Sequence, residues 1–336
     1  MRAPAFWWRE ERTIASTLAA PAAAVYGAIA TARLKRPGER VGVPVVCVGN
    51  PTLGGAGKTP TALAVVKLLI AAGERPVLLS RGYGGALAGP LAVVPRRHRA
   101  DDVGDEPLLL ARVAPTIIAR DRLAGARAAR DAAASVIVMD DGFQNPALVK
   151  DVAILVVDGR RGIGNGRVIP AGPLRAPLAR QLERAHAMMI VGEGPGATLA
   201  ANAAQAHGLA LFRAHLEPDA NAIAALKGRQ VLAFAGIGDP EKFFATLAAA
   251  GIDAPVRRGY ADHHRYSAFD AAALLAEARR GDLILLTTEK DLVRFQGNRA
   301  VGELSARARA LPVTLVLEAP QIFGEFLLGR IKARSI

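Results

Sequence analysis

Short apolar runs and amphipathic stretches alternate along the chain after residue 40. The run Val43–Val48 is rich in β-branched residues and predicts a buried strand, and a helical pattern follows over Thr59–Ala72 and ends at Gly73. Five further apolar runs predict strands: Pro76–Leu79, Thr116–Ala119, Val136–Met139, Val152–Val157 and Ala187–Val191. Continuous apolar strands that alternate with helices are typical of a parallel, doubly wound α/β sheet.

A second series of elements predicts a second lobe. Residues 194–210 are rich in Gly and Ala and include Pro195, which favours a boundary or connector. Beyond it we expect strands at Gln230–Ala235, Leu283–Thr287 and Pro312–Leu317, and a helix at Pro240–Ala250. With 336 residues and about 150 residues per domain, the chain is expected to divide into two α/β/α lobes. The expected bounds are 39–205 for the first lobe, 206–225 for a connector and 226–336 for the second lobe.

Residues 1–38 precede both lobes and predict a helix at a membrane surface. The stretch Thr13–Leu34 carries no charge except Arg33, but it is rich in Ala and therefore weakly apolar for a bilayer span of about 20 residues. Trp7 and Trp8 lie beside basic residues, which is the composition of a membrane-interface anchor. Two alternatives stay open: an ordinary packing helix of a soluble protein, and a true span. No convincing signal-peptide cleavage site follows.

Composition narrows the classes of partner. The formal net charge of +13 favours an anionic partner, such as a nucleotide, nucleic acid, acidic lipid or phosphorylated substrate. No zinc-finger spacing and no aromatic-basic pattern of RNA recognition is present, so nucleic acid is not expected, and no feature indicates an obligate protein partner. The single cysteine, Cys47, lies in an apolar run, which excludes a disulfide framework and is typical of a core position.

The segment between the first strand and the first helix predicts a phosphate-binding loop. It reads Val48-Gly49-Asn50-Pro51-Thr52-Leu53-Gly54-Gly55-Ala56-Gly57-Lys58-Thr59 and departs from the strict pattern only at Thr52, where that pattern has Gly. The glycines let backbone N–H groups surround an oxyanion, and the helix start adds its positive dipole end. Lys58 supplies a charge for the terminal phosphates, and Thr59 supplies a hydroxyl for Mg²⁺. A plain Gly-rich turn is the competing interpretation.

Acidic motifs could complete a phosphoryl-transfer site. Asp140 and Asp141 follow the strand Val136–Met139, where carboxylates beside a phosphate loop hold Mg²⁺. Asp105 and Glu106 precede an apolar helix and could equally be ordinary residues of its first turn. Asp262-His263-His264 offers metal ligands or a proton-transfer pair, and Thr288-Glu289-Lys290-Asp291 puts charge at a strand end, where such folds bind ligands.

Taken together, these segments resemble one family, the tetraacyldisaccharide 4'-kinases of lipid A biosynthesis. The matching segments span about residues 45–295, and the Thr at position 52 also belongs to the family's loop. They are Gly49–Pro60, Ser80-Arg81-Gly82-Tyr83-Gly84, Gly104–Pro107, Asp140–Gln144, Pro170-Ala171-Gly172-Pro173-Leu174-Arg175, Asp262-His263 and Thr288-Glu289-Lys290-Asp291.

The resemblance implies an ATP- and Mg²⁺-dependent kinase that phosphorylates the 4'-hydroxyl of an acylated glucosamine disaccharide 1-phosphate. It also implies two α/β/α lobes, the first P-loop NTPase-like, and an N-terminal amphipathic helix at the cytoplasmic face of the inner membrane, peripheral or monotopic. The residues that the family pattern assigns are as follows: Asp105, His263, Asp262 and Lys58 for catalysis; Thr52, Leu53, Gly54, Gly55, Ala56, Gly57, Lys58 and Thr59 for ATP; Thr59, Glu106, Asp141 and Gln144 for the metal; Arg81 and Arg175 for the substrate.

Two positions depart from the family pattern. Ala176 stands where an acidic residue usually follows the Gly-Pro-Leu-Arg motif, and Asn145 stands where a His often follows Asp-Asp-Gly-Phe-Gln. A P-loop ATPase or GTPase that acts on a protein partner remains the first alternative function. A non-enzymatic basic protein that binds membrane or nucleic acid is the second, and it leaves the phosphate loop unexplained.

Overall fold

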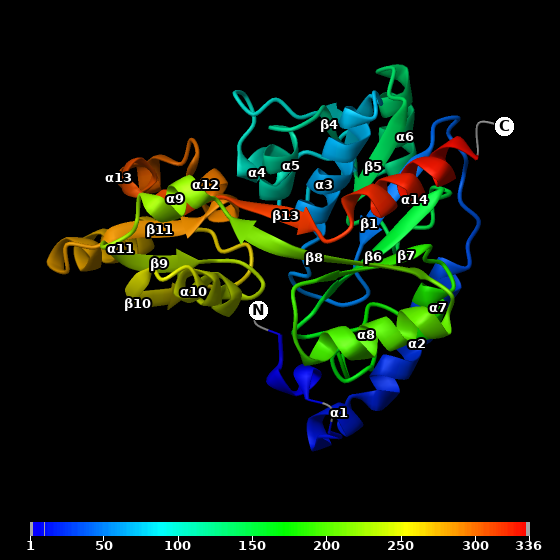
Figure 1. The fold of residues 1–336 in the computed structure, drawn as a ribbon, viewed down its shortest axis with the longest axis horizontal. Helices are drawn as coiled ribbons and strands as arrows, with labels where there is room; N and C mark the ends of the chain where they lie inside the picture. The colour runs from blue at the N-terminus through cyan, green and yellow to red at the C-terminus, as the bar shows by residue number, and fades with distance from the viewer. Residues whose placement is uncertain (1–2, 10, 334–336) are drawn as a thin grey trace.

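Two β-sheets organise the computed structural model, which describes residues 3–9 and 11–333 (Figure 1). The larger sheet has nine strands in the order β13-β8-β7-β6-β1-β5-β2-β4-β3. Its inner strands are parallel, and only β3 and β13, at the two edges, run antiparallel to their neighbours. The strands are β1 (Val45–Gly49), β2 (Pro76–Ser80), β3 (Leu91–Ala92), β4 (Thr116–Ile118), β5 (Val136–Asp140), β6 (Val152–Asp158), β7 (Ala187–Val191), β8 (Ala210–Pro218) and β13 (Val313–Leu317).

Helices cover both faces of this sheet, as the alternation of strands and helices predicted. On one face α3 and α14 pack against the side chains of Val46 and Val48, and on the other α6, α7 and α8 pack around Cys47. The helices of this lobe are α3 (Lys58–Ala71), α4 (Ala100–Val103), α5 (Asp105–Leu110), α6 (Arg122–Asp131), α7 (Leu178–Leu182), α8 (Pro195–Ala206) and α14 (Pro320–Lys332).

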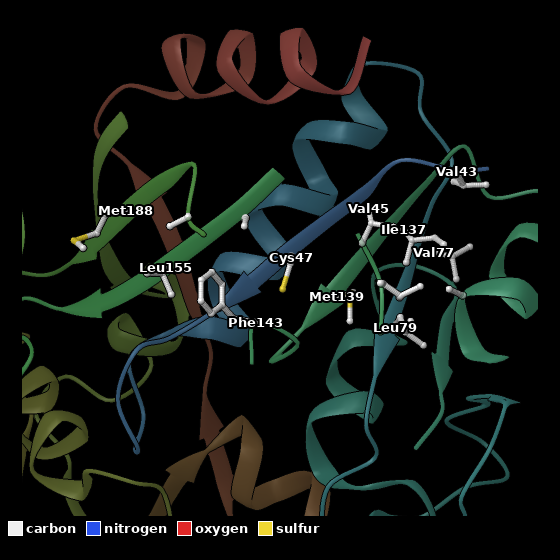
Figure 2. Packing of buried hydrophobic residues seen from close by; sticks show 14 of the residues in the cluster. Val43, Val45, Cys47, Val77, Leu79, Ile137, Met139, Phe143, Leu155 and Met188 are labelled. Atoms are coloured by element: carbon white, nitrogen blue, oxygen red, sulfur yellow. The ribbon is translucent and has the colours of Figure 1, made fainter. Parts of the chain in front are cut away.

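Cys47 lies at the centre of the second of these faces, beside Phe143, Met139 and Leu155 (Figure 2). The side chain is fully buried, and burial raises the pKa of its thiol to about 11. A thiol that stays protonated in an apolar core is unreactive, so the prediction of a core cysteine is confirmed.

The smaller sheet is wholly parallel, with the order β10-β9-β11-β12. Helix α10 covers one face with Phe243, Phe244 and Leu247, while α11, α12 and α13 enclose the other around Phe295. Its elements are α9 (Ala220–Ala224), β9 (Gln230–Ala235), α10 (Pro240–Ala249), β10 (Asp253–Gly259), α11 (Ala268–Arg280), β11 (Ile284–Thr288), α12 (Glu289–Phe295), η2 (Arg299–Val301), α13 (Gly302–Arg307) and β12 (Arg309–Leu311).

The predicted lobe boundaries were wrong at two places. Residues 194–210 are no connector, because most of them form α8 and the strand β8 follows within the larger sheet. Beyond the smaller sheet the chain returns, since Val313–Leu317 pairs with β8 and α14 packs on the larger sheet. The second lobe therefore comprises about residues 219–312. The physical reason is that an edge strand can pair with a strand far away in the sequence, and its residues do not indicate which strand that is.

The N-terminal segment forms η1 (Ala5–Trp8), α1 (Ile14–Leu18) and α2 (Ala20–Leu34). Trp7 is buried, and its indole N–H donates to Pro170 O at 3.0 Å, while the Arg161 guanidinium lies over the ring of Trp8. Trp7 is therefore held within the protein, whereas Trp8 is half-buried, and the interpretation of this segment as a membrane-interface anchor stays a prediction. Among the described residues no helix is long and apolar enough to cross a bilayer.

Candidate functional site

The predicted phosphate loop connects β1 to α3 at the carboxyl edge of the larger sheet. Gly57 begins the helix with a left-handed φ of 92°, and Gly54 has a φ of 108°, conformations that L side chains rarely adopt. A Cβ built on Gly54 or Gly55 would meet nothing within 4 Å, so the backbone here faces open space. The Asn50 side chain donates to Gly54 O at 3.2 Å and holds the loop from below. Left-handed glycines allow successive N–H groups to converge on an anion, and the phosphate-binding role of this loop stays a prediction.

Asp140 ends β5 directly beneath the start of α3. Its Oδ2 accepts a hydrogen bond from the Thr59 hydroxyl at 3.2 Å, while its Oδ1 is buried without a partner. Burial and the neighbouring carboxylates of Glu106 and Asp141 raise the pKa of Asp140 to about 7. A carboxylate with a free buried oxygen beside a threonine hydroxyl is a suitable oxygen pair for a divalent cation.

Asp141 points to the cations of the loop instead. It has a left-handed φ of 53°, which turns its carboxylate toward Lys58 at 3.8 Å and toward Arg175 at 2.9 and 3.2 Å. Burial disfavours its ionised form, but Lys58 and Arg175 outweigh this and lower its pKa. The sequence pattern offered both Asp140 and Asp141 as metal ligands, and the family resemblance assigned Asp141; the structure brings Asp140, not Asp141, to the Thr59 hydroxyl.

Gln144 holds the phosphate loop through hydrogen bonds of its side-chain amide. Its amide donates to Asn50 O at 2.9 Å and to Gln181 Oε1 at 3.0 Å, and its carbonyl oxygen lies 3.4 Å from an Arg175 nitrogen. Arg175 also donates to Thr52 O at 3.0 Å. These contacts put both side chains at the phosphate-loop end of the site.

Asp105 and His263 meet across the two lobes. Asp105 begins α5 in the first lobe, and its Oδ2 lies 3.0 Å from Nδ1 of His263, which follows β10 in the second lobe. Asp262 is close by, with Oδ1 3.8 Å from His263 Nε2. Burial opposes ionisation of Asp105, but the hydrogen bond to His263 and the charges of Lys290 and Arg294 lower its pKa well below the usual value. The pair that the sequence predicted is therefore assembled.

Helix α12 brings two cations to this pair. Lys290 Nζ lies 2.9 Å from Glu106 Oε1, and Arg294 Nε donates to Asp105 Oδ2 at 2.6 Å. Lys290 outweighs the effect of burial and lowers the pKa of Glu106, which was assigned to the metal from the sequence but pairs with Lys290 here. Sequence reasoning missed Arg294. Its spacing of four residues from Lys290, which puts both on one helix face, was the available signal.

The second lobe also contacts the phosphate loop. A Cβ built on Gly238 would lie 2.9 Å from Gly55 N, and Lys242 Nζ lies 3.5 Å from Gly55 O. Lys242 forms an ion pair with Asp158, the last residue of β6, and Asp239 forms pairs with Arg160 and Arg161 of the first lobe. The lobes are therefore closed over the loop, with the carboxyl ends of both parallel sheets facing the same space.

A pocket of about 160 Å³ opens beside the Asp105–His263 pair. Tyr83 borders it with its ring edge toward His263, at a centroid distance of 5.1 Å, and 61% of Tyr83 is exposed. Arg81 is exposed at the end of β2, in the same motif. The predicted contact of Arg81 or Arg175 with a substrate phosphate stays a prediction.

Comparisons with known proteins identify the family of this chain. The family model described as tetraacyldisaccharide-1-P 4'-kinase matches residues 15–332. A tetraacyldisaccharide 4'-kinase of Rhodopseudomonas palustris (strain BisA53) is 56% identical over 333 residues, covering 99% of this chain and 97% of that protein. Another, from Nitrobacter winogradskyi, is 52% identical over 337 residues and covers all of both chains. The crystal structure of LpxK from Aquifex aeolicus in complex with ATP matches with a TM-score of 0.72 at 27% identity, covering 94% of this chain and 99% of that one.

Proposed function

The chain belongs to the tetraacyldisaccharide-1-P 4'-kinase family, and from this premise we propose that it moves the γ-phosphoryl of ATP to the 4'-hydroxyl of tetraacyldisaccharide 1-phosphate. The product would be lipid IVA, an intermediate of lipid A biosynthesis. One observation carries the proposal: the loop with Lys58 and Thr59 faces the same space as Asp105 and His263, which come together from different lobes.

The nucleotide end of the reaction uses the loop from Thr52 to Thr59. Backbone N–H groups of this loop and the Lys58 ammonium would hold the β- and γ-phosphates. In the closed structure Lys58 lies near Asp141, which Arg175 also holds, so the lysine is oriented before phosphate arrives. Preorganised cations of this kind stabilise the charge that spreads over the transferred group.

Thr59 and Asp140 are the residues that fit Mg²⁺. Both offer hard oxygen ligands, and the unpaired buried Oδ1 of Asp140 is an unused donor atom in this position. When bound, the ion would neutralise the phosphate oxygens. No group of three or more acidic, His or Cys side chains that could hold a metal occurs among the described residues, which suits an ion that keeps water and phosphate ligands.

The acceptor end uses the pair across the lobes. The 4'-hydroxyl would enter the pocket beside His263 and transfer its proton to the Asp105–His263 pair as it attacks the γ-phosphorus. Asp262 would support the histidine from its own loop. Because the pair exists only when the lobes meet, closure and chemistry are coupled, which protects the phosphoryl group from water.

The N-terminal helices would hold the protein at the cytoplasmic face of the inner membrane, where the acyl chains of the substrate lie. Ile14, Leu18, Val25 and Ile29 are between 64% and 81% exposed. Their spacing of four, seven and four residues puts them on one side of the helical segment, while Ala23 and Gly27 are buried. An apolar side followed by exposed basic residues, Lys35 and Arg36, is typical of an interfacial helix.

Transfer of label from γ-labelled ATP to tetraacyldisaccharide 1-phosphate in detergent micelles with Mg²⁺ tests the activity. We expect labelled lipid with the wild type and none with Lys58→Ala, while Lys67→Ala, an exposed lysine on the same helix, keeps the activity. ATP consumed without labelled lipid would contradict the acceptor assignment. It would favour the alternative of an ATPase or GTPase that acts on a protein partner.

Membrane attachment has its own test, sedimentation with vesicles that contain anionic lipid. The double variant Ile14→Ser and Val25→Ser should bind vesicles less than the wild type, because each loses exposed apolar area. Ile322→Ser is the matched control, since Ile322 is 62% exposed on α14, away from the N-terminal helices (Figure 1). Equal binding by all three proteins would refute the role of this helix side.

A further inference from the structure

Arg294 is buried within the lobe interface and contacts both lobes. It lies on α12 of the second lobe with 8% of its side chain exposed. Its Nη1 donates to Gly236 O at 2.7 Å and to Asp291 Oδ1 at 2.8 Å, both in the second lobe. Its Nε and Nη2 lie 2.6 and 2.5 Å from Asp105 Oδ2 in the first lobe. One guanidinium therefore connects the framework of the second lobe to the carboxylate beside the pocket.

The second-lobe end of this connection is rigid. Asp291 is fully buried, and its Oδ1 accepts from Gly236 N and from the Tyr266 hydroxyl, both at 3.0 Å. Its Oδ2 accepts from the Thr288 hydroxyl at 2.6 Å. Two of the groups that Arg294 contacts, Gly236 O and Asp291, therefore belong to the second lobe's own framework.

The first-lobe end has little support of its own. Among the described residues, Asp105 Oδ1 accepts from the N–H of Glu106 alone, at 2.8 Å, and Oδ2 takes its partners, His263 and Arg294, from the other lobe. We therefore expect Asp105 to adopt its observed orientation against Nδ1 of His263 when the lobes are closed and α12 lies beside it. Charge-assisted contacts to a planar guanidinium specify direction as well as attraction.

We propose that Arg294 is a positioning residue for phosphoryl transfer, which orients Asp105 against His263 as the lobes close. The inference deepens the proposed function and rests on it. In the step concerned, the acceptor oxygen bonds to the γ-phosphorus, its proton passes to the Asp105–His263 pair, and the bond to the bridging oxygen breaks, with its electron pair leaving on ADP. Arg294 touches none of the reacting atoms and acts through Asp105.

Arg294→Met tests the role by separating turnover from nucleotide binding. We expect kcat for lipid phosphorylation to fall about 100-fold, the size of effect that misplacement by about 1 Å produces, while KM for ATP changes less than about threefold. Arg294→Lys keeps a cation near Asp105 and should recover part of the loss. A kcat close to that of the wild type, or a rise in KM for ATP as large as the fall in kcat, would overturn the proposal.

Thr288→Val is the matched control for stability. It removes the hydroxyl that donates to Asp291 Oδ2 and so weakens the same network without reaching Asp105. It should lower the Tm, because it removes a hydrogen bond to a buried carboxylate, and leave kcat within about threefold of the wild type. If Thr288→Val lowers kcat as strongly as Arg294→Met, loss of the network alone explains the effect and Arg294 has no separate role.

A double-mutant cycle with Asp105→Asn gives the decisive comparison. If Arg294 works through Asp105, the double variant is no slower than Asp105→Asn alone, because nothing remains to be oriented. If the two losses multiply, Arg294 acts elsewhere and the proposal is wrong. A wild-type protein that transfers no phosphate to the lipid would instead refute the proposed function, so the two failures are distinguishable.

Discussion

The contact between Gly238 and the phosphate loop yields a sharp test of lobe closure. A Cβ at position 238 would lie 2.9 Å from Gly55 N and 3.3 Å from Asp262 Oδ2. Gly238 has no left-handed φ, so alanine is not strained by its own backbone there. Gly238→Ala must displace the phosphate loop of the other lobe and, to a smaller extent, the Asp262 carboxylate; the loop must retreat by about half an ångström to restore ordinary contact.

The size of the effect follows from that overlap. Overpacking a close interface costs about 1–3 kcal/mol, and here the cost falls on the closed form alone. Since about 1.4 kcal/mol is a factor of ten in rate, we expect kcat/KM for lipid phosphorylation to fall about 5- to 150-fold.

Gly302→Ala is the matched control. Gly302 lies in the same lobe with helical φ and ψ of −58° and −42°, and a Cβ there would meet nothing within 4 Å. The assay compares label transfer at limiting ATP for both variants and the wild type. If Gly238→Ala is as active as Gly302→Ala, the observed contact between Gly238 and the loop is not needed for transfer and the closure argument fails.

Three further predictions concern buried groups. Asp140→Asn should abolish Mg²⁺-dependent transfer yet raise the Tm of the ATP-free protein at about pH 8. Because the pKa of Asp140 is raised to about 7, the contribution of its protonated form to stability is lost as pH rises through that value. The Tm measured from about pH 5 to 8 should therefore fall less in the variant than in the wild type. Trp7→Ala should lower the free energy of unfolding by about 3–5 kcal/mol, measured by urea titration with Trp8→Ala as the comparison, since it removes a buried ring and its bond to Pro170 O. Asp239→Asn should reduce kcat/KM at least about tenfold, because it weakens the contacts with Arg161 and Arg160. Charged hydrogen bonds of this kind contribute about 1.5–3 kcal/mol. Unchanged kinetics would show that these ion pairs are not needed for lobe closure.

Most of the larger sheet was predictable because its inner strands are buried on both faces. All seven residues of β6 are buried, so the strand reads as an unbroken apolar run. Strand β8 was missed because Phe212 and Ala214 point inward while Arg213 and Glu217 are more exposed, and such alternation in an Ala-rich context resembles a connector. Alternating apolar and polar residues are typical of a strand with one buried and one exposed face, such as a strand near the edge of a sheet.

The site was predictable as a set of motifs and in the pairing of Asp105 with His263, but not in its other pairings. Asp140 and Asp141 are adjacent, and only the left-handed φ at Asp141 decides which one faces Thr59 and which faces Lys58. Residue type does not reveal which of the two positions has this backbone angle, because both are Asp. Arg294 was missed for a different reason: its partner Asp105 lies 189 residues away in the other lobe, and its spacing from Lys290 was the one sequence signal available.

The smaller sheet and its helices have the topology of an insertion. The chain leaves the larger sheet after Pro218 and re-enters it at Val313, and these two residues face each other in the antiparallel pair of β8 and β13. Asp219 N donates to Pro312 O at 2.9 Å, so the outgoing and incoming strands are still hydrogen-bonded at the crossing. A tight two-residue turn is enough to join such strand ends. A chain with residues 219–312 replaced by that turn would therefore keep every strand of the larger sheet and the whole phosphate loop, but would lack His263, Lys290 and Arg294.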